Sequence, residues 1–467
     1  MHPDLAKARE LLDADDPQGA VRELRAVADD LTAAELAPLV ARLAELVGID
    51  DLARAAAALA AAAAPTPTAA APTGSAPTAA APAGGPVAPG ALYAYGYACI
   101  EHGLSELAVP ALRQALSGAL RGEGAPEARR RLFGRSRRAA AEVNPRQVLL
   151  ELAVALEDGE RHAEAAELLD GHRELTGDWP DRYLLAHNAL MAGQLDRARE
   201  AFDGLSAPDE TWRPAADRIR RTLARAAAVP PAGPADLRGW HHVLTGGLLA
   251  TRSPFGYDAG MAGRWAYLQG GWDDCRLGLE RLGAILAATG RRPAAVALLP
   301  DRGSRALGLA AAELLGLPAA PYRPGTPDAL VVAYDLNEVD PELLEQLHER
   351  APGELLYEHA TCWTDTPAVS ADVCGLLVQR IVAPWEPRMT VDEDGEVSEA
   401  PADGRPAEEL AREILAASAE PDPGDGSAPP DPLEELERFA ARAAATWATG
   451  TRDRIRSAGP VRSSRFH

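Results

Sequence analysis

The chain has 467 residues and a formal net charge of −22, because 69 Asp and Glu residues outnumber 47 Lys and Arg residues. This length predicts two or three domains rather than one core, and the acidic balance argues against nucleic acid as a partner, since phosphate contacts need a basic face. Lys7 is the only lysine, which excludes a Walker-type phosphate loop and a Schiff-base enzyme, because each needs a lysine in its site.

The apolar runs, the first residues and the cysteines bear on location. No apolar run approaches the ~20 residues that span a bilayer, and residues 1–16 have an acidic helical pattern rather than that of a signal peptide. The cysteines form no CxxC pair, which is typical of reduced thiols in the cytosol. We therefore predict a cytoplasmic protein with no membrane contact, no cofactor and no metal. Abundant Ala, Arg, Pro and Gly beside a single Lys is typical of a high-GC bacterial genome.

The first half of the chain has helical periodicity that is interrupted once. Residues 1–64 predict antiparallel helix pairs with apolar stripes that include Leu24 and Leu39. Residues 65–90 are a low-complexity run of Ala, Pro and Thr, and they predict a flexible linker because nothing in them offsets the entropy of ordering. Residues 91–229 again predict helices.

Small and large residues recur at a characteristic spacing in these helices. The best copy of the pattern consists of Leu185, Ala186, Ala189, Gly193, Ala198 and Phe202. A second copy consists of Gly103, Ala108, Leu112 and Ala115, with weaker copies near Ala8 and Ala155. The pattern resembles the tetratricopeptide repeat, in which small residues let paired helices approach closely. The resemblance implies a solenoid whose groove binds a partner protein or peptide.

An arginine cluster lies between these predicted repeats. It consists of Arg129, Arg130, Arg131, Arg135, Arg137 and Arg138. One interpretation is a patch for acidic partners or nucleic acid, and the other is a solvated helix that balances the acidic remainder of the chain. The cluster has no interleaved aromatic residues, which favours the second interpretation.

The pattern changes in residues 236–390, which contain five of the eight tryptophans. Strands are predicted at 296–299, 329–334 and 355–359, and helices at 272–288, after residue 304, at 342–350 and at 369–381. Such alternation implies a mainly parallel sheet that is covered on both faces. The predicted fold class is therefore an α-helical repeat solenoid plus a separate α/β domain with a mainly parallel, doubly covered sheet.

The remainder of the chain is expected to lie outside this domain. Residues 391–432 predict an acidic Pro-rich tail, residues 433–450 a C-terminal helix, and residues 451–467 a basic disordered end.

The loop after the first long strand is the foremost candidate site. It consists of Asp301, Arg302, Gly303, Ser304 and Arg305. Backbone N–H groups between a strand and a helix bind anions and nucleotides in α/β proteins. The order of elements over residues 270–365 is similar to that of a type I phosphoribosyltransferase. The resemblance implies that this loop cradles pyrophosphate and that Asp335 holds a ribose hydroxyl.

The sequence departs from that family at the residues that carry its chemistry. Tyr334 stands in place of the first of two acidic residues, and residues 337–340 replace the phosphate loop with a run that includes two carboxylates. These carboxylates would repel a phosphate dianion, and the glycine that permits close backbone approach is missing. We expect loss of transferase activity with, at most, retained ligand binding. A doubly wound nucleotide-binding fold fits the element order almost as well.

Two other groups of residues are candidates. Arg252, Asp258 and Arg264 lie in a glycine-rich aromatic loop, which is either a lid over the carboxyl edge of the sheet or a structural crossover. A second group is His241, His242, His359 and Cys362. In a strand the adjacent histidines would point to opposite faces. One of these histidines, together with His359 and Cys362, could bind zinc, but a buried, hydrogen-bonded histidine is commoner. Cys362 could be a thiol nucleophile, but a packed thiol is commoner.

Two functions follow from these observations. The first is a non-enzymatic scaffold or regulatory protein that binds a partner protein through its repeats and has an α/β domain that supports or senses a small ligand. The second is an enzyme acting on a nucleotide or phosphorylated sugar, with Arg302, Ser304 and Arg305 holding phosphate. Loss of the phosphate loop favours the first.

Overall fold

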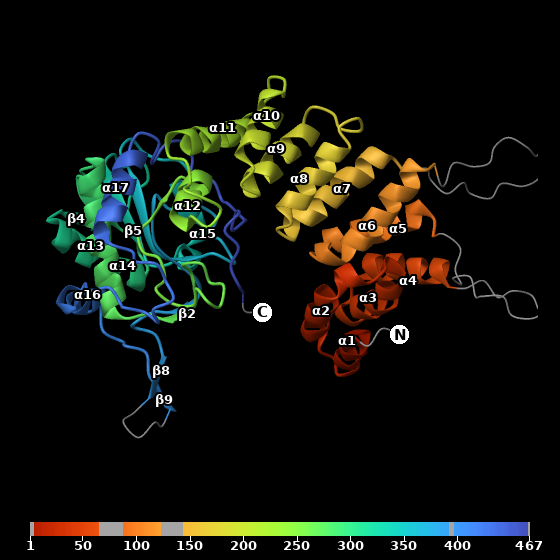
Figure 1. Cartoon of the computed structure of the whole chain (residues 1–467). Coiled ribbons are helices and arrows are strands. Elements are labelled where there is room, and N and C mark those ends of the chain that lie inside the picture. The colour runs from red at the N-terminus through yellow and green to blue at the C-terminus, as the bar shows by residue number, and fades with distance from the viewer. Residues whose placement is uncertain (1–3, 65–86, 123–142, 392–396, 466–467) are drawn as a thin grey trace, which may run out of the picture. The chain divides into compact units, whose positions relative to one another are not determined.

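The computed structural model of the chain describes residues 4–64, 87–122, 143–391 and 397–465 (Figure 1). The chain divides into two compact units. The helical unit comprises residues 1–192 and 200–207, and the sheet unit comprises residues 193–199 and 208–467. The arginine cluster at 129–138 and most of the predicted linker at 65–90 lie outside the described residues.

The helical unit is built from successive helices, most of which pack on the next. Its elements are α1 Asp4–Asp13, α2 Pro17–Ala26, the 3-10 helix η1 Ala28–Asp30, α3 Ala33–Val47, α4 Asp50–Ala63, α5 Pro89–Glu101, α6 Ser105–Leu120, α7 Pro145–Asp158, α8 His162–Gly171, α9 Asp181–Met191 and α10 Leu195–Asp203, which the two units share. In addition, α5 contacts α7 and α7 contacts α9. The small residues permit close approach, since a Cβ on Gly96 would lie 2.6 Å from Cγ of Leu112 on α6.

The sheet unit contains every strand of the described residues. Its elements are α11 Arg213–Ala228, α12 Leu237–Thr245, β1 Leu248–Leu249, β2 Trp265–Gln269, α13 Trp272–Thr289, β3 Ala295–Leu298, α14 Arg302–Leu315, β4 Ala319–Pro321, β5 Ala329–Ala333, the 3-10 helix η2 Leu336–Glu338, α15 Pro341–His348, β6 Leu355–Cys362, β7 Val373–Val382, β8 Arg388–Val391, β9 Val397–Ala400, α16 Ala407–Ala416 and α17 Leu433–Ala443.

Strands β1 to β7 form one parallel sheet, and the prediction of a mainly parallel sheet is confirmed. The strand order is β1-β7-β6-β5-β3-β4, and β2 pairs with β7 as well. The antiparallel hairpin β8–β9 is separate. Because β4 lies on one side of β3 and β5 lies on the other, the direction of winding reverses between β3 and β5. The carboxyl ends of β3 and β5 form this switch point, which is where open α/β sheets bind ligands.

Strand β5 is buried along its whole length, which explains its unbroken apolar sequence. Leu330 and Val332 belong to a core cluster with residues of α13, α14, α16 and α17. Val331 and Ala333 belong to a second cluster with Leu344 and Leu347 of α15. Helices α16 and α17 pack on α14 and α13, so these late helices lie beside much earlier elements of the chain (Figure 1).

One predicted element and one predicted domain boundary differ from the structure. Residues 369–381, predicted as a helix, are largely strand β7, which pairs with β6 and with both β1 and β2. A short apolar run such as residues 373–378, which are buried, has no decisive period, so the pairing partners of β7 identify it as a strand. Likewise, the sheet unit continues to the end of the chain rather than ending at 390, because α16, α17 and the residues after them complete its core.

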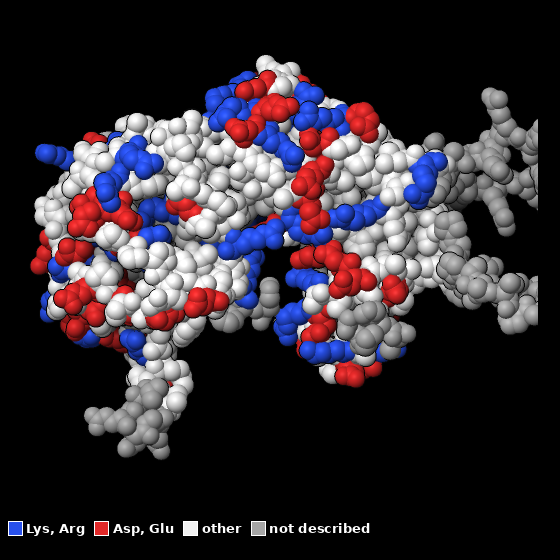
Figure 2. Space-filling view, in the orientation of Figure 1, with Lys and Arg blue, Asp and Glu red and all other residues white. Residues whose placement is uncertain are grey.

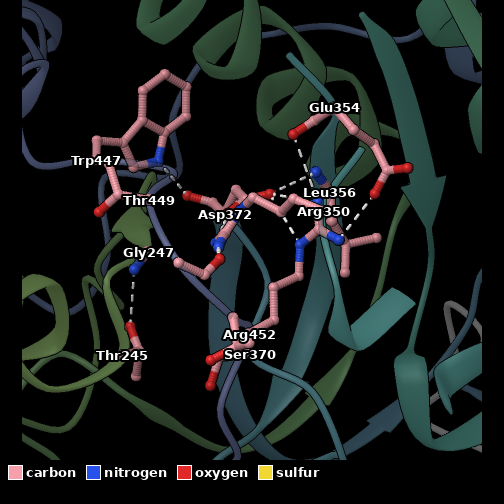
Figure 3. Close-up of polar contacts among 12 residues, drawn as sticks. Thr245, Gly247, Arg350, Glu354, Leu356, Ser370, Asp372, Trp447, Thr449 and Arg452 are labelled. Atoms are coloured by element: carbon pink, nitrogen blue, oxygen red, sulfur yellow. Dashed lines mark hydrogen bonds and ion pairs between the residues drawn. The ribbon is translucent and has the colours of Figure 1, made fainter. Parts of the chain in front are cut away.

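The basic end of the chain is anchored by Arg452, which is fully buried rather than frayed. Its guanidinium lies 2.9 Å from Oδ2 of Asp372 and 2.8 Å from Oε1 of Glu354 (Figure 3). Asp372 also accepts a hydrogen bond from Arg350, and its backbone oxygen accepts one from Nε1 of Trp447 at 2.7 Å. Burial would raise the pKa of Asp372, but the charges of Arg452 and Arg350 outweigh it and lower that pKa.

A second anchor fixes the predicted acidic tail. The carboxylate of Asp431 is approached by Arg238 at 2.9 Å, by Arg252 at 3.2 Å and by Arg281 at 2.7 Å. The Asp431 side chain is only 13% exposed. Burial would raise its pKa, whereas the three guanidinium charges lower it, and the net direction is downward. Residues 391–432, apart from 392–396, are therefore held by specific contacts.

Candidate functional site

The switch point brings together the predicted loop of 301–305 and Asp335. Asp301 caps α14, because its Oδ1 accepts a hydrogen bond from N of Ser304 at 2.7 Å. The hydroxyl of Ser304 in turn accepts a hydrogen bond from N of Tyr334 at 3.0 Å and is fully buried. Asp335 caps η2 by accepting from N of Asn337 at 2.8 Å. The sequence therefore located the two loops of the switch point, and the hydrogen bond between Tyr334 and Ser304 joins them.

Aromatic side chains fill the space over the start of α14. The Trp385 ring lies 4.7 Å from the ring of Tyr334 and 5.9 Å from that of Trp272, measured between centroids. A Cβ on Gly303 would lie only 2.8 Å from Cζ2 of Trp385. Gly303 thus admits an indole of the same chain at the position where a phosphate would meet the helix N-terminus.

The two arginines of the loop are engaged by the segment after β9. Arg302 donates hydrogen bonds to the backbone oxygens of Asp403 at 2.6 Å and Arg405 at 3.3 Å. Arg305 pairs with Glu408 at 3.1 Å. These contacts direct both cations toward residues 403–408 of the same chain.

Two carboxyl groups near the switch point have raised pKa values. Burial raises the pKa of Asp335 to about 6, with smaller contributions from neighbouring carboxylates. Burial and the charge of Asp335 raise the pKa of Glu358 to about 8. Glu358 is fully buried, its Oε1 accepts from N of Leu336 at 2.8 Å, and its Oε2 lies in a short contact with Oγ1 of Thr361. Sequence analysis missed Glu358, because an acid within an apolar strand carries no distinctive spacing.

The loop candidates lie in three different environments. Arg252 binds Asp431 and the backbone oxygen of Pro430, so its role in the structure is to hold the tail. Asp258 is exposed. Arg264 is 2% exposed and lines a cavity beside Trp363. The structure does not bring this loop together with the residues of the switch point into one cavity among those described.

The histidines and cysteines that suggested zinc or thiol chemistry are dispersed. His241 and His242 lie on helix α12 rather than on a strand. His359 contacts Sγ of Cys275 at 3.9 Å and the hydroxyl of Tyr357 at 3.3 Å. Burial lowers the pKa of His359 to about 4 and raises the pKa of Cys275, so both groups are neutral. Among the described residues, no group of three His, Cys, Asp or Glu side chains is placed to hold a metal ion.

The helical unit carries a surface that sequence analysis did not single out. We call it the tyrosine face, and it consists of Tyr93, Tyr97, Glu101 and Glu151. The rings of Tyr93 and Tyr97 on α5 stack at 6.1 Å between centroids with an interplanar angle of 29°. Tyr97 is 41% exposed. The spacing of four residues along α5 could have predicted this row, but not the approach of Glu151 from α7.

The carboxylates of the tyrosine face influence the tyrosines and each other. Burial and the charge of Glu101 raise the pKa of Glu151. The charge of Glu101 raises the pKa of Tyr97, and burial followed by the charge of Glu151 raises that of Tyr93. The face thus combines aromatic rings with two carboxylates that repel one another.

No protein-family model matches the chain, and no curated protein or solved structure gives a significant match. None of the helices in the described part of the chain combines the length and the apolar character that crossing a bilayer requires. Acidic and basic side chains are interspersed on the face of the sheet unit drawn in Figure 2, rather than gathered by sign. Functional inference therefore depends on the local chemistry of the two sites above.

Proposed function

We propose that the protein is a non-enzymatic scaffold or regulatory protein that binds a basic segment of a partner protein on the tyrosine face. The observation that carries the proposal is the stack of half-buried Tyr93 on exposed Tyr97, beside the carboxylates of Glu101 and Glu151. An arginine or lysine of a partner would offset the repulsion between these carboxylates. It would also gain roughly 0.5–2 kcal/mol over a tyrosine ring.

The arrangement of the helices supports this location. Contacts of α5 with α7, and of α7 with α9, set alternate helices of the unit side by side. In the tetratricopeptide repeat, which the sequence resembles, the corresponding helices line the groove that receives a peptide. The tyrosine face lies on two such helices, α5 and α7.

The chemistry at the switch point supports a non-enzymatic protein. Its indole packs on Gly303, Arg302 binds a backbone oxygen, and one carboxylate oxygen of Asp301 caps α14, all within the same chain. Only Oδ2 of Asp301 and the hydroxyl of Tyr334 are buried there without a hydrogen-bond partner among the described residues. A phosphorylated substrate would have to displace Trp385 and would then meet Asp335 and Glu358, whose burial already disfavours further negative charge.

The test uses the full-length protein and two labelled peptides of equal length, one rich in arginine and one with serine in place of arginine. We expect fluorescence anisotropy to detect binding of the arginine peptide alone. Tyr97→Ala should weaken it about tenfold, because a cation–π contact is worth roughly 0.5–2 kcal/mol and 1.4 kcal/mol is tenfold. A variant combining Glu101→Gln and Glu151→Gln should weaken binding further and reduce its salt dependence.

Glu45→Gln is the control, because Glu45 is an exposed carboxylate on α3, a helix that carries no residue of the tyrosine face. If Glu45→Gln weakens binding as much as the paired change, attraction to the acidic chain as a whole accounts for it. The proposal is then wrong. Equal binding of both peptides would have the same meaning.

The alternative function, an enzyme acting on a nucleotide or phosphorylated sugar, is favoured by one observation. Carboxyl groups with raised pKa values often mark catalytic sites, and Asp335 and Glu358 lie at the edge where such folds bind ligands. A rise in the thermal midpoint of the full chain with phosphoribosyl pyrophosphate or a nucleotide, abolished by Arg302→Ala, would support it. No rise with any of these compounds would leave the first function alone.

A further inference from the structure

A cavity of about 70 Å³ lies in the sheet unit, remote from the tyrosine face in sequence and formed by different elements. It is lined by α12, by residues of β6 and β7 and the connection between them, and by residues 455–458. Since one water occupies at least ~10–15 Å³ on this measure, the cavity has room for roughly five groups of water size. Its apolar walls include Leu237, Trp240, Leu244, Trp363, Leu377 and Ile455.

Of the described side chains that line this cavity, one is charged, and it is a cation. Arg264 is 2% exposed, and its Cζ lies 5.3 Å from the centroid of the Trp363 ring. One Nη of Arg264 donates to the backbone oxygen of Ala458 at 3.3 Å. Arg465 lies over the same indole at 5.4 Å, which adds a second positive charge close by. In a chain with 69 Asp and Glu residues, no described Asp or Glu lines the cavity.

His241 supplies a second polar group. Its Nε2 is enclosed and has no hydrogen-bond partner among the described residues, although its ring lines the cavity. Burial, His242 and Arg264 lower the pKa of His241 to about 3, so the ring is neutral at physiological pH. A neutral imidazole whose Nε2 carries the proton can donate one hydrogen bond, and a buried donor without a partner costs about 1–3 kcal/mol. An acceptor in the cavity would recover that free energy.

We propose that this cavity binds a small organic acid, whose carboxylate lies between Arg264 and Nε2 of His241 and whose hydrocarbon part lies against Trp240. Arginine and a neutral N–H donor complement a carboxylate. The apolar walls complement a short hydrocarbon chain, and the volume limits the ligand to a few non-hydrogen atoms. This inference is independent of the proposed partner binding, because it concerns other residues in the other unit.

The first experiment compares propionate with propionamide, which has nearly the same shape and no charge. The full-length protein is heated in each compound at equal ionic strength, and binding heat is measured by calorimetry. At about ten times its dissociation constant, propionate should raise the midpoint of the sheet unit by roughly 3 °C, whereas propionamide should leave it unchanged.

Three variants test the location. Arg264→Gln removes the cation and should abolish the effect of propionate. Ala371→Leu extends a side chain from the cavity wall and should abolish it by filling the space, even if Arg264→Gln fails to fold. Arg462→Gln removes an exposed positive charge from the same end of the chain and should leave binding unchanged.

Three results would overturn the proposal. The first is that propionate gives neither heat nor a shift in the wild-type protein at millimolar concentration. The second is that propionamide acts as strongly as propionate, because the cation would then not select the ligand. The third is that binding survives in Ala371→Leu, because the acid would then bind elsewhere.

Discussion

Replacing Glu358 by Gln should flatten the dependence of stability on pH. Gln keeps the shape of the protonated acid: its amide oxygen can accept from N of Leu336, as Oε1 of Glu358 does at 2.8 Å, and its amide nitrogen can donate to Thr361. The variant differs only in that the side chain at position 358 can no longer gain or lose a proton. Because Glu358 is fully buried, that equilibrium differs strongly between the folded and unfolded chain.

The sign follows from the direction of the shift. The pKa of Glu358 is raised from 4.5 in the unfolded chain to about 8 in the folded protein. The stabilisation from holding this proton is present below 4.5 and is lost as the pH rises through about 8. Between these values the free energy of unfolding should fall by about 1.4 kcal/mol per pH unit, or by at most roughly 5 kcal/mol in total.

The assay is urea unfolding from about pH 5 to about pH 8.5, followed by tryptophan fluorescence. Seven of the eight tryptophans lie in the sheet unit, so the signal reports mainly on this unit. The difference in the free energy of unfolding between the wild type and Glu358→Gln isolates the contribution of this one carboxyl group. The control is Glu345→Gln, at an exposed position of α15, which should follow the wild-type curve. Parallel curves for wild type and Glu358→Gln would refute the reasoning, because the buried carboxyl would then titrate as it does in the unfolded chain.

Three further substitutions test the contacts that hold the sheet unit together. Asp431→Asn should lower the free energy of unfolding by about 3–5 kcal/mol in urea titrations, because three guanidinium groups lose their charge partner. Arg452→Met should cost a similar ~3–5 kcal/mol, whereas Arg454→Met, whose ion pair is exposed, should cost at most ~1 kcal/mol; equal losses would contradict the burial argument. Gly303→Ala should lower the thermal midpoint through ~1–3 kcal/mol of overpacking against Trp385, and Gly404→Ala, with nothing within 4 Å, should not.

The sequence predicted those features whose cause is local. The strand β3, the helix α14 and the loop between them follow from an apolar run, an Asp that caps a helix and a glycine, which act over a few residues. The parallel sheet follows from the alternation of strands and helices. Even the placement of Asp335 beside that loop follows from the rule that the carboxyl ends of parallel strands meet at one edge.

What the sequence could not predict depends on contacts across long separations. Nothing near Trp385 indicates that its ring rests on Gly303, and nothing near Arg302 indicates that residues 403–405 accept its hydrogen bonds. The predicted acidic tail has the composition of a solvated segment, yet Asp431 binds three arginines from separate elements and helps to fix the tail to the sheet unit. Amino-acid composition describes a segment as a whole, and it does not reveal a single side chain that helps to fix the segment to the fold.

The use of arginine in place of lysine can be related to the buried arginines of the sheet unit. Five arginines are buried in its described residues: Arg225, Arg238, Arg264, Arg281 and Arg452. Arginine stays charged when buried and offers five donors in a fixed plane, whereas lysine offers one compact charge that is readily neutralised. All five use these donors to bind carbonyl or carboxylate oxygens elsewhere in the chain. Arg264 is the one that lines the cavity beside His241. Because arginine keeps its charge when it is buried, Arg264 could bind an acid at this depth. A lysine at the same depth would be readily neutralised and would not provide that charge.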